Sequence, residues 1–209
     1  MSACRDPRRR VARVCSQGGS PLAAGMVVLA ALGLTACGTG GTSGGSADTK
    51  FVQGTGGVST VAKEDRKSAP SLSGKTLEGK QLDVDDYRGK IVVLNIWGSW
   101  CSPCRAEAPN LVKVAERTKK QGVEFVGINT RDTNEHNAQK FEKEYEVPYP
   151  SLYDPIGKLM LRFPKGSLNP QAIPTTIILD RDGRIAVRAL TPLSEEALDK
   201  ALKPLIAEK

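Results

Sequence analysis

The feature that most constrains the fold of this chain is an apolar run that ends just before two closely spaced cysteines. Residues Ile91 to Trp97 read IVVLNIW, a nearly unbroken apolar segment rich in β-branched side chains. Such a run is typical of a strand that is buried on both faces in a central sheet. After Trp100 the apolar residues recur at helical spacing as far as residue 120. The sequence therefore predicts that a buried strand gives way to a helix at Cys101 and Cys104.

Further along the chain, strand-like and helix-like segments alternate. The predicted strands lie in a hairpin at residues 72–82 and at residues 123–128, 175–179 and 184–190, with a weak edge strand within residues 51–62. The predicted helices follow Trp100 and cover residues 135–145, residues 155–163 and a last segment that begins at the N-cap Ser194. This order, a βαβ unit followed by a ββα unit, indicates an α/β domain.

The two cysteines have the spacing and position of a redox-active pair. Residues three apart at the start of a helix lie on one face, about 5.5 Å apart, which suits a disulfide. The unpaired N–H groups and the positive dipole end at the helix N-terminus stabilise a thiolate at Cys101. Cys104, one turn inside, is expected to be shielded and to resolve a mixed disulfide. Pro103 has no N–H to lose in the first turn and stiffens the segment between them.

Other uses of two cysteines fit the sequence less well. A structural zinc site needs four ligands, and the domain offers this pair and one remote histidine, His136. Haem attachment needs a histidine after the second cysteine, where Arg105 stands. An inert bridge is open to any exported cysteine pair, but a bridge that spans three residues constrains the unfolded chain very little. Redox catalysis without a metal or cofactor is therefore the favoured interpretation.

Residues 1–36 have the three parts of a lipoprotein signal peptide. Five arginines and one aspartate precede a charge-free run of fifteen residues that ends in LTACG. This end resembles the bacterial lipobox, which predicts cleavage before Cys37 and lipidation of its sulfur. An uncleaved anchor remains an alternative, although the run is shorter than the ~20 residues that span a bilayer. Export by the general or by the twin-arginine route is also open, because Arg9 and Arg10 are adjacent.

Removal of the signal changes what the charge implies. The whole chain carries a net charge of +7, but residues 1–36 hold five of the 30 basic and one of the 23 acidic residues, so +3 remains. The remaining sequence has no Lys/Arg cluster with interleaved aromatic residues, so a nucleic-acid partner is not expected. We assign residues 37–68 to a flexible tether with the weak edge strand and residues 69–209 to the folded domain.

The motif and its surroundings resemble the thioredoxin superfamily, and within it the membrane-tethered TlpA and ResA type. The similarity lies in residues 93–109 (VLNIWGSWCSPCRAEAP), in the preceding GKIV and in the distant IPTT of residues 173–176, and it extends over about residues 69–207. It implies a thioredoxin fold, in which helices flank a central mixed sheet, with an N-terminal hairpin extension and an inserted helical segment around residues 135–168. It also implies that Pro174 is cis and faces the cysteines, which an X-Pro bond allows.

Two positions need separate comment: one differs from thioredoxin, and the other has a role in the subfamily that this sequence resembles. Asn95 stands where thioredoxin has a buried aspartate, and an amide cannot accept a proton. Glu107 lies three residues after Cys104 on the same helix face, and the resemblance links a glutamate there to the acidity of the cleft and to partner recognition. We therefore expect Glu107 to tune proton transfer to the cysteines, the alternative being a solvated helix carboxylate. Trp97 is expected in the core and Trp100 as a wall of the cleft.

These features together predict a thiol–disulfide oxidoreductase held by a lipid on the extracytoplasmic face of the cell membrane. The resemblance favours the reducing direction on disulfide-bearing exported proteins such as apocytochrome c, with a membrane electron donor of the thiol type and a monomeric enzyme. Three alternatives stay open: an oxidant that introduces disulfides, a peroxiredoxin-like antioxidant enzyme, and a non-catalytic tethered binding module. The motif alone does not decide the direction, because direction follows the reduction potential and the available partner.

Overall fold

The computed structural model describes residues 49–208. The predicted signal peptide, its lipidation site Cys37 and the tether up to residue 48 lie outside these residues. Within the described part, no helix combines the length and the apolar character that a membrane crossing requires.

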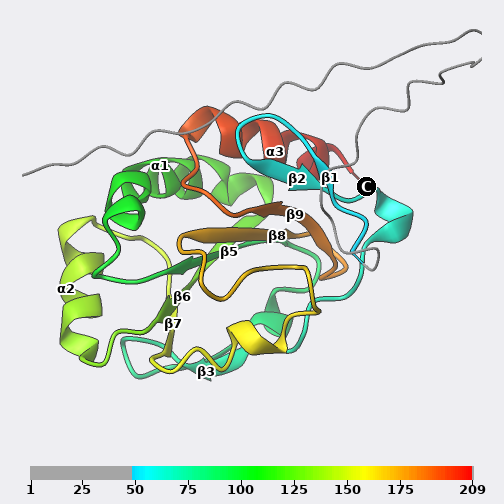
Figure 1. Ribbon diagram of the computed structural model, residues 1–209. Helices are drawn as coiled ribbons and strands as arrows, with labels where there is room; N and C mark the ends of the chain where they lie inside the picture. The colour runs from blue at the N-terminus through cyan, green and yellow to red at the C-terminus, as the bar shows by residue number, and fades with distance from the viewer. Residues whose placement is uncertain (1–48, 209) are drawn as a thin grey trace, which may run out of the picture. The chain divides into compact units, whose positions relative to one another are not determined.

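A seven-stranded mixed sheet forms the centre of the domain (Figure 1). Its strands, in spatial order, are β1 (Val52–Gln53), β2 (Val58–Thr60), β9 (Ile185–Ala189), β8 (Thr175–Leu179), β5 (Ile91–Trp97), β6 (Val123–Thr130) and β7 (Ser151–Asp154). Strands β5, β6 and β7 are parallel, whereas β8 runs antiparallel to β5 and β9 runs antiparallel to β8. Every residue of β5 is buried, as its apolar run predicts for the middle of a sheet.

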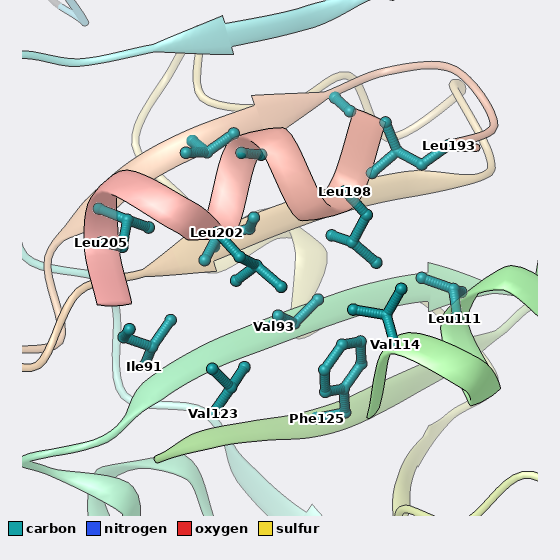
Figure 2. Close-up of a cluster of buried hydrophobic side chains, with 14 of the residues drawn as sticks. Ile91, Val93, Leu111, Val114, Val123, Phe125, Leu193, Leu198, Leu202 and Leu205 are labelled. Atoms are coloured by element: carbon teal, nitrogen blue, oxygen red, sulfur yellow. The ribbon is translucent and has the colours of Figure 1, made fainter. Parts of the chain in front are cut away.

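Helices α1 (Ser102–Thr118) and α3 (Glu195–Ala207) cover one face of the sheet (Figure 1). The alternation of side chains along β5 directs Ile91 and Val93 toward these helices. Figure 2 shows the resulting core, in which leucines of α3 meet the strands and α1. The labelled members of this cluster are Ile91, Val93, Leu111, Val114, Val123, Phe125, Leu193, Leu198, Leu202 and Leu205.

The opposite face of the sheet is covered mainly by a hairpin and a short turn rather than by long helices. The hairpin pairs β3 (Ser73–Lys75) with β4 (Gln81–Asp83), which confirms the expected N-terminal extension. Leu72, directly before this hairpin, is buried in the same cluster as Val92 and Leu94 of β5. The remaining helix, α2 (Glu135–Glu144), contributes Phe141 to a separate cluster around Trp97.

The prediction of a helix at residues 155–163 is wrong. Only a three-residue 3-10 turn, Met160–Arg162, forms there, because Gly157 adopts a left-handed backbone (φ 74°) and Asp154 caps the turn through the N–H groups of Lys158 and Leu159. Strand β7, just before this segment, was not predicted. It is four residues long and exists because it pairs with β6, which its own sequence does not reveal. The inserted segment is therefore helical only in part.

The folded unit begins before residue 69. The predicted edge strand is present as the β1–β2 hairpin, and β2 pairs with β9. The buried Arg66 guanidinium donates to Glu208 at 2.7 Å and to Asp180 at 3.1 Å, so this segment is tied to the end of α3 and to the β8–β9 turn. Residues 49–68, which we assigned to the tether, are therefore part of the fold.

Candidate active site at the start of helix α1

Cys101 and Cys104 form a disulfide where β5 has ended and α1 begins. Their Cα atoms are 5.3 Å apart, close to the separation that the helical spacing predicts. Cys101 is the N-cap of α1, and its Sγ accepts a hydrogen bond from the Cys104 backbone N–H at 3.2 Å. Cys104 is 1% exposed, in line with its expected shielding, but Cys101 is also nearly covered, at 3%. A helix N-terminus with a sulfur at the cap position is therefore the chemical centre of the site.

The segment that carries Pro174 lies beside Cys101. The Ile173–Pro174 peptide bond is cis, as the resemblance implies. The carbonyl oxygen of Ile173 lies 3.8 Å from Cys101 Sγ. Strand β8 follows directly and pairs antiparallel with β5, with Thr175 opposite Ile96. This pairing brings two segments that are 72 residues apart in sequence to the same end of the sheet.

The loop between β5 and Cys101 is held by Asp132, a residue that the sequence did not single out. The Asp132 carboxylate is buried and accepts hydrogen bonds from the backbone N–H and the hydroxyl of Ser99 and from the Asn129 amide. From the other side, Arg105 donates to the Ser99 carbonyl at 2.8 and 3.1 Å. No local pattern marks Asp132 for this role, because the loop that it holds is about 30 residues upstream.

The two tryptophans occupy different environments: Trp97 lies in the core, as expected, and Trp100 is exposed. Trp97 is 3% exposed, stacks on Phe141 with ring centroids 4.3 Å apart, and belongs to the cluster that includes both cysteines. Trp100 is 50% exposed and lies against the backbone of Gly98, where any Cβ would stand 2.6 Å from its indole nitrogen. The Arg131 guanidinium lies 4.8 Å from the centroid of the Trp100 ring. Trp100 is thus a fixed surface residue next to Cys101.

Glu107 is a buried carboxylate, not a solvated one. The residue is 1% exposed. One carboxylate oxygen accepts a hydrogen bond from the Asn95 amide at 2.9 Å, and the other accepts from the Leu193 N–H at 3.0 Å. Burial raises the pKa of Glu107 to about 7, although both hydrogen bonds act in the opposite direction. The group therefore changes its charge near neutral pH, and its partner is the asparagine that marks the departure from thioredoxin.

Glu142 on α2 is a partly buried carboxylate that was not expected from the sequence. Burial raises its pKa to about 7; a hydrogen bond with Ser151 lowers it, and the charge of Glu78 adds to the increase. The Ser151 hydroxyl also accepts a hydrogen bond from the Trp97 indole at 3.2 Å. One carboxylate oxygen of Glu142 has no hydrogen-bond partner. The helical spacing of α2 gave no signal for this partial burial or for the contact with Ser151 of β7.

The described residues contain no cluster of side chains suited to bind a metal ion. Within residues 49–208, no group of three or more His, Cys, Asp and Glu side chains is arranged to hold a metal ion. His136 is exposed in the first turn of α2.

A disulfide-forming cysteine pair at the N-terminus of the helix after the central strand, with the cis-proline segment beside it, defines a thiol–disulfide oxidoreductase of the thioredoxin type. The chain belongs to the AhpC/TSA family, whose model matches residues 66–188.

Named relatives have the same class of activity in their descriptions. The thiol:disulfide interchange protein HelX of Rhodobacter capsulatus is 38% identical over 144 residues, which cover 68% of this chain and 76% of HelX. The thiol-disulfide oxidoreductase ResA of Bacillus cereus is 31% identical over 139 residues, covering 66% of this chain and 77% of ResA. The crystal structure of a secreted thiol-disulfide isomerase from Corynebacterium glutamicum matches with a TM-score of 0.69 and 32% identity, over 79% of this chain and 100% of that chain.

Proposed function

We propose that this protein is an extracytoplasmic disulfide reductase in which Cys101 attacks and Cys104 resolves. The observation that carries the proposal is the place of Cys101 at the N-cap of α1, with the Cys104 N–H directed at its sulfur. In the reduced protein, that N–H and the other unpaired N–H groups of the first turn stabilise a thiolate at Cys101. Cys104 lies inside the helix and lacks this environment.

The proposed reaction proceeds through a mixed disulfide. The Cys101 thiolate attacks one sulfur of a substrate disulfide and expels the other substrate sulfur as a thiolate. Cys104, as a thiolate, then attacks Cys101 Sγ, which releases the second substrate sulfur and forms the Cys101–Cys104 disulfide. Two electrons pass to the substrate, which leaves as a dithiol once its sulfurs are protonated. The 5.3 Å separation of the two Cα atoms allows this closure without a change in the helix.

Glu107 is proposed to serve the second step. Cys104 must lose a proton before it can attack, and Glu107 lies one helical turn further along the same face. A carboxylate whose pKa is about 7 accepts a proton and returns it at neutral pH with little cost in either direction. Its hydrogen bonds to Asn95 and Leu193 fix the carboxylate in place while its charge changes.

The cellular role follows from the signal segment and from the relatives. The predicted signal peptide and Cys37 support export and anchoring by a lipid on the outer face of the membrane. The similarity to HelX and ResA, named for disulfide interchange and oxidoreduction, supports disulfide-bearing exported proteins as substrates, and apocytochrome c before haem attachment as one of them. A membrane protein that donates electrons through thiols would then return the Cys101–Cys104 pair to the dithiol.

The central test is the variant Cys104→Ser in the full chain. Without the resolving thiol, we expect a mixed disulfide to accumulate between Cys101 and its substrate, visible as a band that disappears on reduction. Mass spectrometry of that band identifies the substrate. The matched variant Cys101→Ser should trap nothing at Cys104, since only the sulfur at the N-cap position of α1 has the environment that stabilises a thiolate. Equal trapping by both variants, or none by either, would contradict the assigned roles.

Two further measurements separate this reaction from its alternatives. A reduction potential for the Cys101–Cys104 pair close to that of thioredoxin, roughly −270 mV, supports the reductase, whereas a value near −120 mV supports an oxidant. Consumption of peroxide with turnover of a single sulfur would support a peroxidase instead. A tethered binding module predicts unchanged function in the variant with both cysteines replaced by serine, and the proposal predicts its loss.

A further inference from the structure

We propose that Trp100, Arg105 and Arg131 form a docking face for an acidic segment next to the reactive cysteine of the substrate. We call these three residues the basic aromatic face. The inference deepens the proposed function and rests on it. It assigns a chemistry to the partner that neither the cysteine motif nor the fold supplies.

The first support is the way in which Trp100 is held at the surface. The Trp100 side chain is 50% exposed, so much of its apolar surface forgoes the favourable free energy of burial. Here the indole lies on Gly98, where no larger residue fits, and Arg131 lies over the ring. The side chain is therefore fixed in place before any partner binds, so docking on it costs little conformational entropy.

The second support is the backbone of Arg131. This residue has φ 57°, in the left-handed region that L-residues other than glycine, asparagine and aspartate rarely adopt. The conformation is imposed because the next residue, Asp132, must reach back to hold Ser99. Glycine would meet the same requirement without strain. An arginine at this position is therefore less favourable for the backbone than glycine, and the interaction that its side chain makes is the one with the Trp100 ring.

The third support is the charge of the face. Within residues 49–208, neither Arg105 nor Arg131 forms an ion pair; Arg105 donates only to the Ser99 carbonyl. Among the described residues, Arg66, Arg88 and Arg117 pair with carboxylates. Of the arginines that do not, Arg131 lies over the Trp100 ring and Arg105 is bonded to the residue before Trp100. The acidic side chain next to Arg131 in sequence is Asp132, but it is buried and occupied by three donors. Arg131, on the Trp100 ring, and Arg105, bonded to the carbonyl of the preceding residue Ser99, thus have no carboxylate partner among the described residues.

These properties fit an extended peptide segment with aspartate or glutamate close to its cysteine. Guanidinium groups bind carboxylates with two parallel hydrogen bonds, and the exposed indole accepts the apolar part of the same segment. Because Cys101 follows Trp100 directly in sequence, a segment bound on this face presents its neighbouring cysteine to the attacking sulfur. Charge complementarity would mainly raise the rate of encounter, and salt would reduce the effect.

The test compares two cyclic peptides, each closed by one disulfide and identical except that aspartates or lysines flank the cysteines. Each rate constant for reduction by the protein is divided by that for dithiothreitol, which removes the intrinsic reactivity of the peptide. For the reduced wild-type protein at low salt, we expect the normalised rate to favour the acidic peptide by about tenfold. High salt should reduce the ratio to nearly one, and Arg131→Glu should abolish or reverse it.

Two variants control for charge and for folding. Arg184→Glu makes the same charge change at an exposed residue next to the turn that joins β8 and β9, and it should leave the ratio unchanged. Arg131→Gly suits the left-handed backbone, so we expect a protein at least as stable as wild type that has nevertheless lost the preference. Full preference in Arg131→Gly, or equal losses in Arg131→Glu and Arg184→Glu, would overturn the inference.

The same assay separates the two proposals. If the wild-type protein reduces both peptides readily but without preference, the docking face is refuted and the reductase stands. If it reduces neither peptide faster than dithiothreitol does, the proposed function fails and the docking face fails with it.

Discussion

At the scale of single residues, the most informative group is Glu107. Burial of a carboxylate is unfavourable because the group loses its hydration. Glu107 is 1% exposed, and its two hydrogen bonds compensate only part of that loss. Burial remains the dominant influence and raises its pKa to about 7. The ionised form is therefore disfavoured in the folded protein, and the cost appears in both stability and reactivity.

The stability effect has a defined sign. Below pH 4.5 Glu107 is protonated in the folded and unfolded states alike. As the pH rises toward 7, the unfolded chain ionises first, so folding loses up to about 3 kcal/mol at 1.36 kcal/mol for each pH unit of separation. We expect Glu107→Gln, measured against wild type by urea denaturation, to be more favourable at pH 8 than at pH 4, because the amide never ionises. The loss of one of the two acceptor oxygens acts equally at both pH values. The exposed Glu116→Gln on the same helix should be neutral at both pH values.

Reactivity provides an independent measurement at the same residue. If Glu107 moves the proton of Cys104, Glu107→Gln should slow the resolution of a mixed disulfide and flatten its pH dependence around pH 7, while the first attack by Cys101 stays close to the wild-type rate. Stopped-flow kinetics with a single-disulfide substrate resolves the two steps. Unchanged resolution kinetics, together with unchanged cysteine titration, would remove Glu107 from the mechanism.

At the scale of elements, the active site depends on the contact between two loops. One loop joins β5 to α1 and contains Ser99, and the other follows β6 and contains Asp132. Both lie at the carboxyl ends of neighbouring parallel strands, which is why they meet. Hydrogen bonds from Ser99 and Asn129 converge on one buried carboxylate, so this contact sets the position of Trp100 and of the N-terminus of α1.

Removal of that carboxylate should therefore weaken the whole junction. In Asp132→Ala, the Ser99 N–H, its hydroxyl and the Asn129 amide all lose their acceptor in a buried position. We expect a loss of about 2–4 kcal/mol in the free energy of unfolding and slower reaction of Cys101 with disulfides. The exposed Asp182 in the β8–β9 turn provides the control, and Asp182→Ala should stay within about 0.5 kcal/mol. Equal effects of the two variants would contradict the role of Asp132.

At the scale of the whole domain, an ion-pair cluster ties distant parts of the chain together. Arg66 precedes the hairpin extension, Glu208 ends α3 and Asp180 begins the β8–β9 turn. The Arg66 side chain is 6% exposed, so its charge has little solvent and depends on these carboxylates. The segment around Arg66 is thus structural, and the cluster holds it beside the end of α3 and the β8–β9 turn.

A matched pair of substitutions measures what burial contributes to this cluster. We expect Arg66→Ala to lower the free energy of unfolding by about 3–5 kcal/mol, because two carboxylates lose their buried partner. Arg117 also contacts two carboxylates, Glu195 and Asp199, but its side chain is 43% exposed, and Arg117→Ala should cost no more than about 1 kcal/mol. Similar losses in the two variants would refute the structural role of Arg66.

Local patterns in the sequence were sufficient for the centre of the fold and for the position of the cysteine pair at the start of α1. The apolar run of β5 and the cysteine spacing at the start of α1 act within a few residues, where propensity and capping decide the structure. Resemblance to thioredoxin added the cis-proline, which the structure places beside Cys101. These predictions were correct because each depends on short-range chemistry or on an unusually specific motif.

What the tertiary structure alone decided depends on partners that are distant in sequence. Strand β7 exists through its pairing with β6, residues 49–68 fold through β9 and Glu208, and Asp132 acts on a loop 33 residues away. Glu107 illustrates the same division: its place on the helix follows from the sequence, but its raised pKa follows from the strand and loop that exclude water from it. Pairing and dehydration are properties of the assembled fold, because both require surfaces that a local segment does not contain.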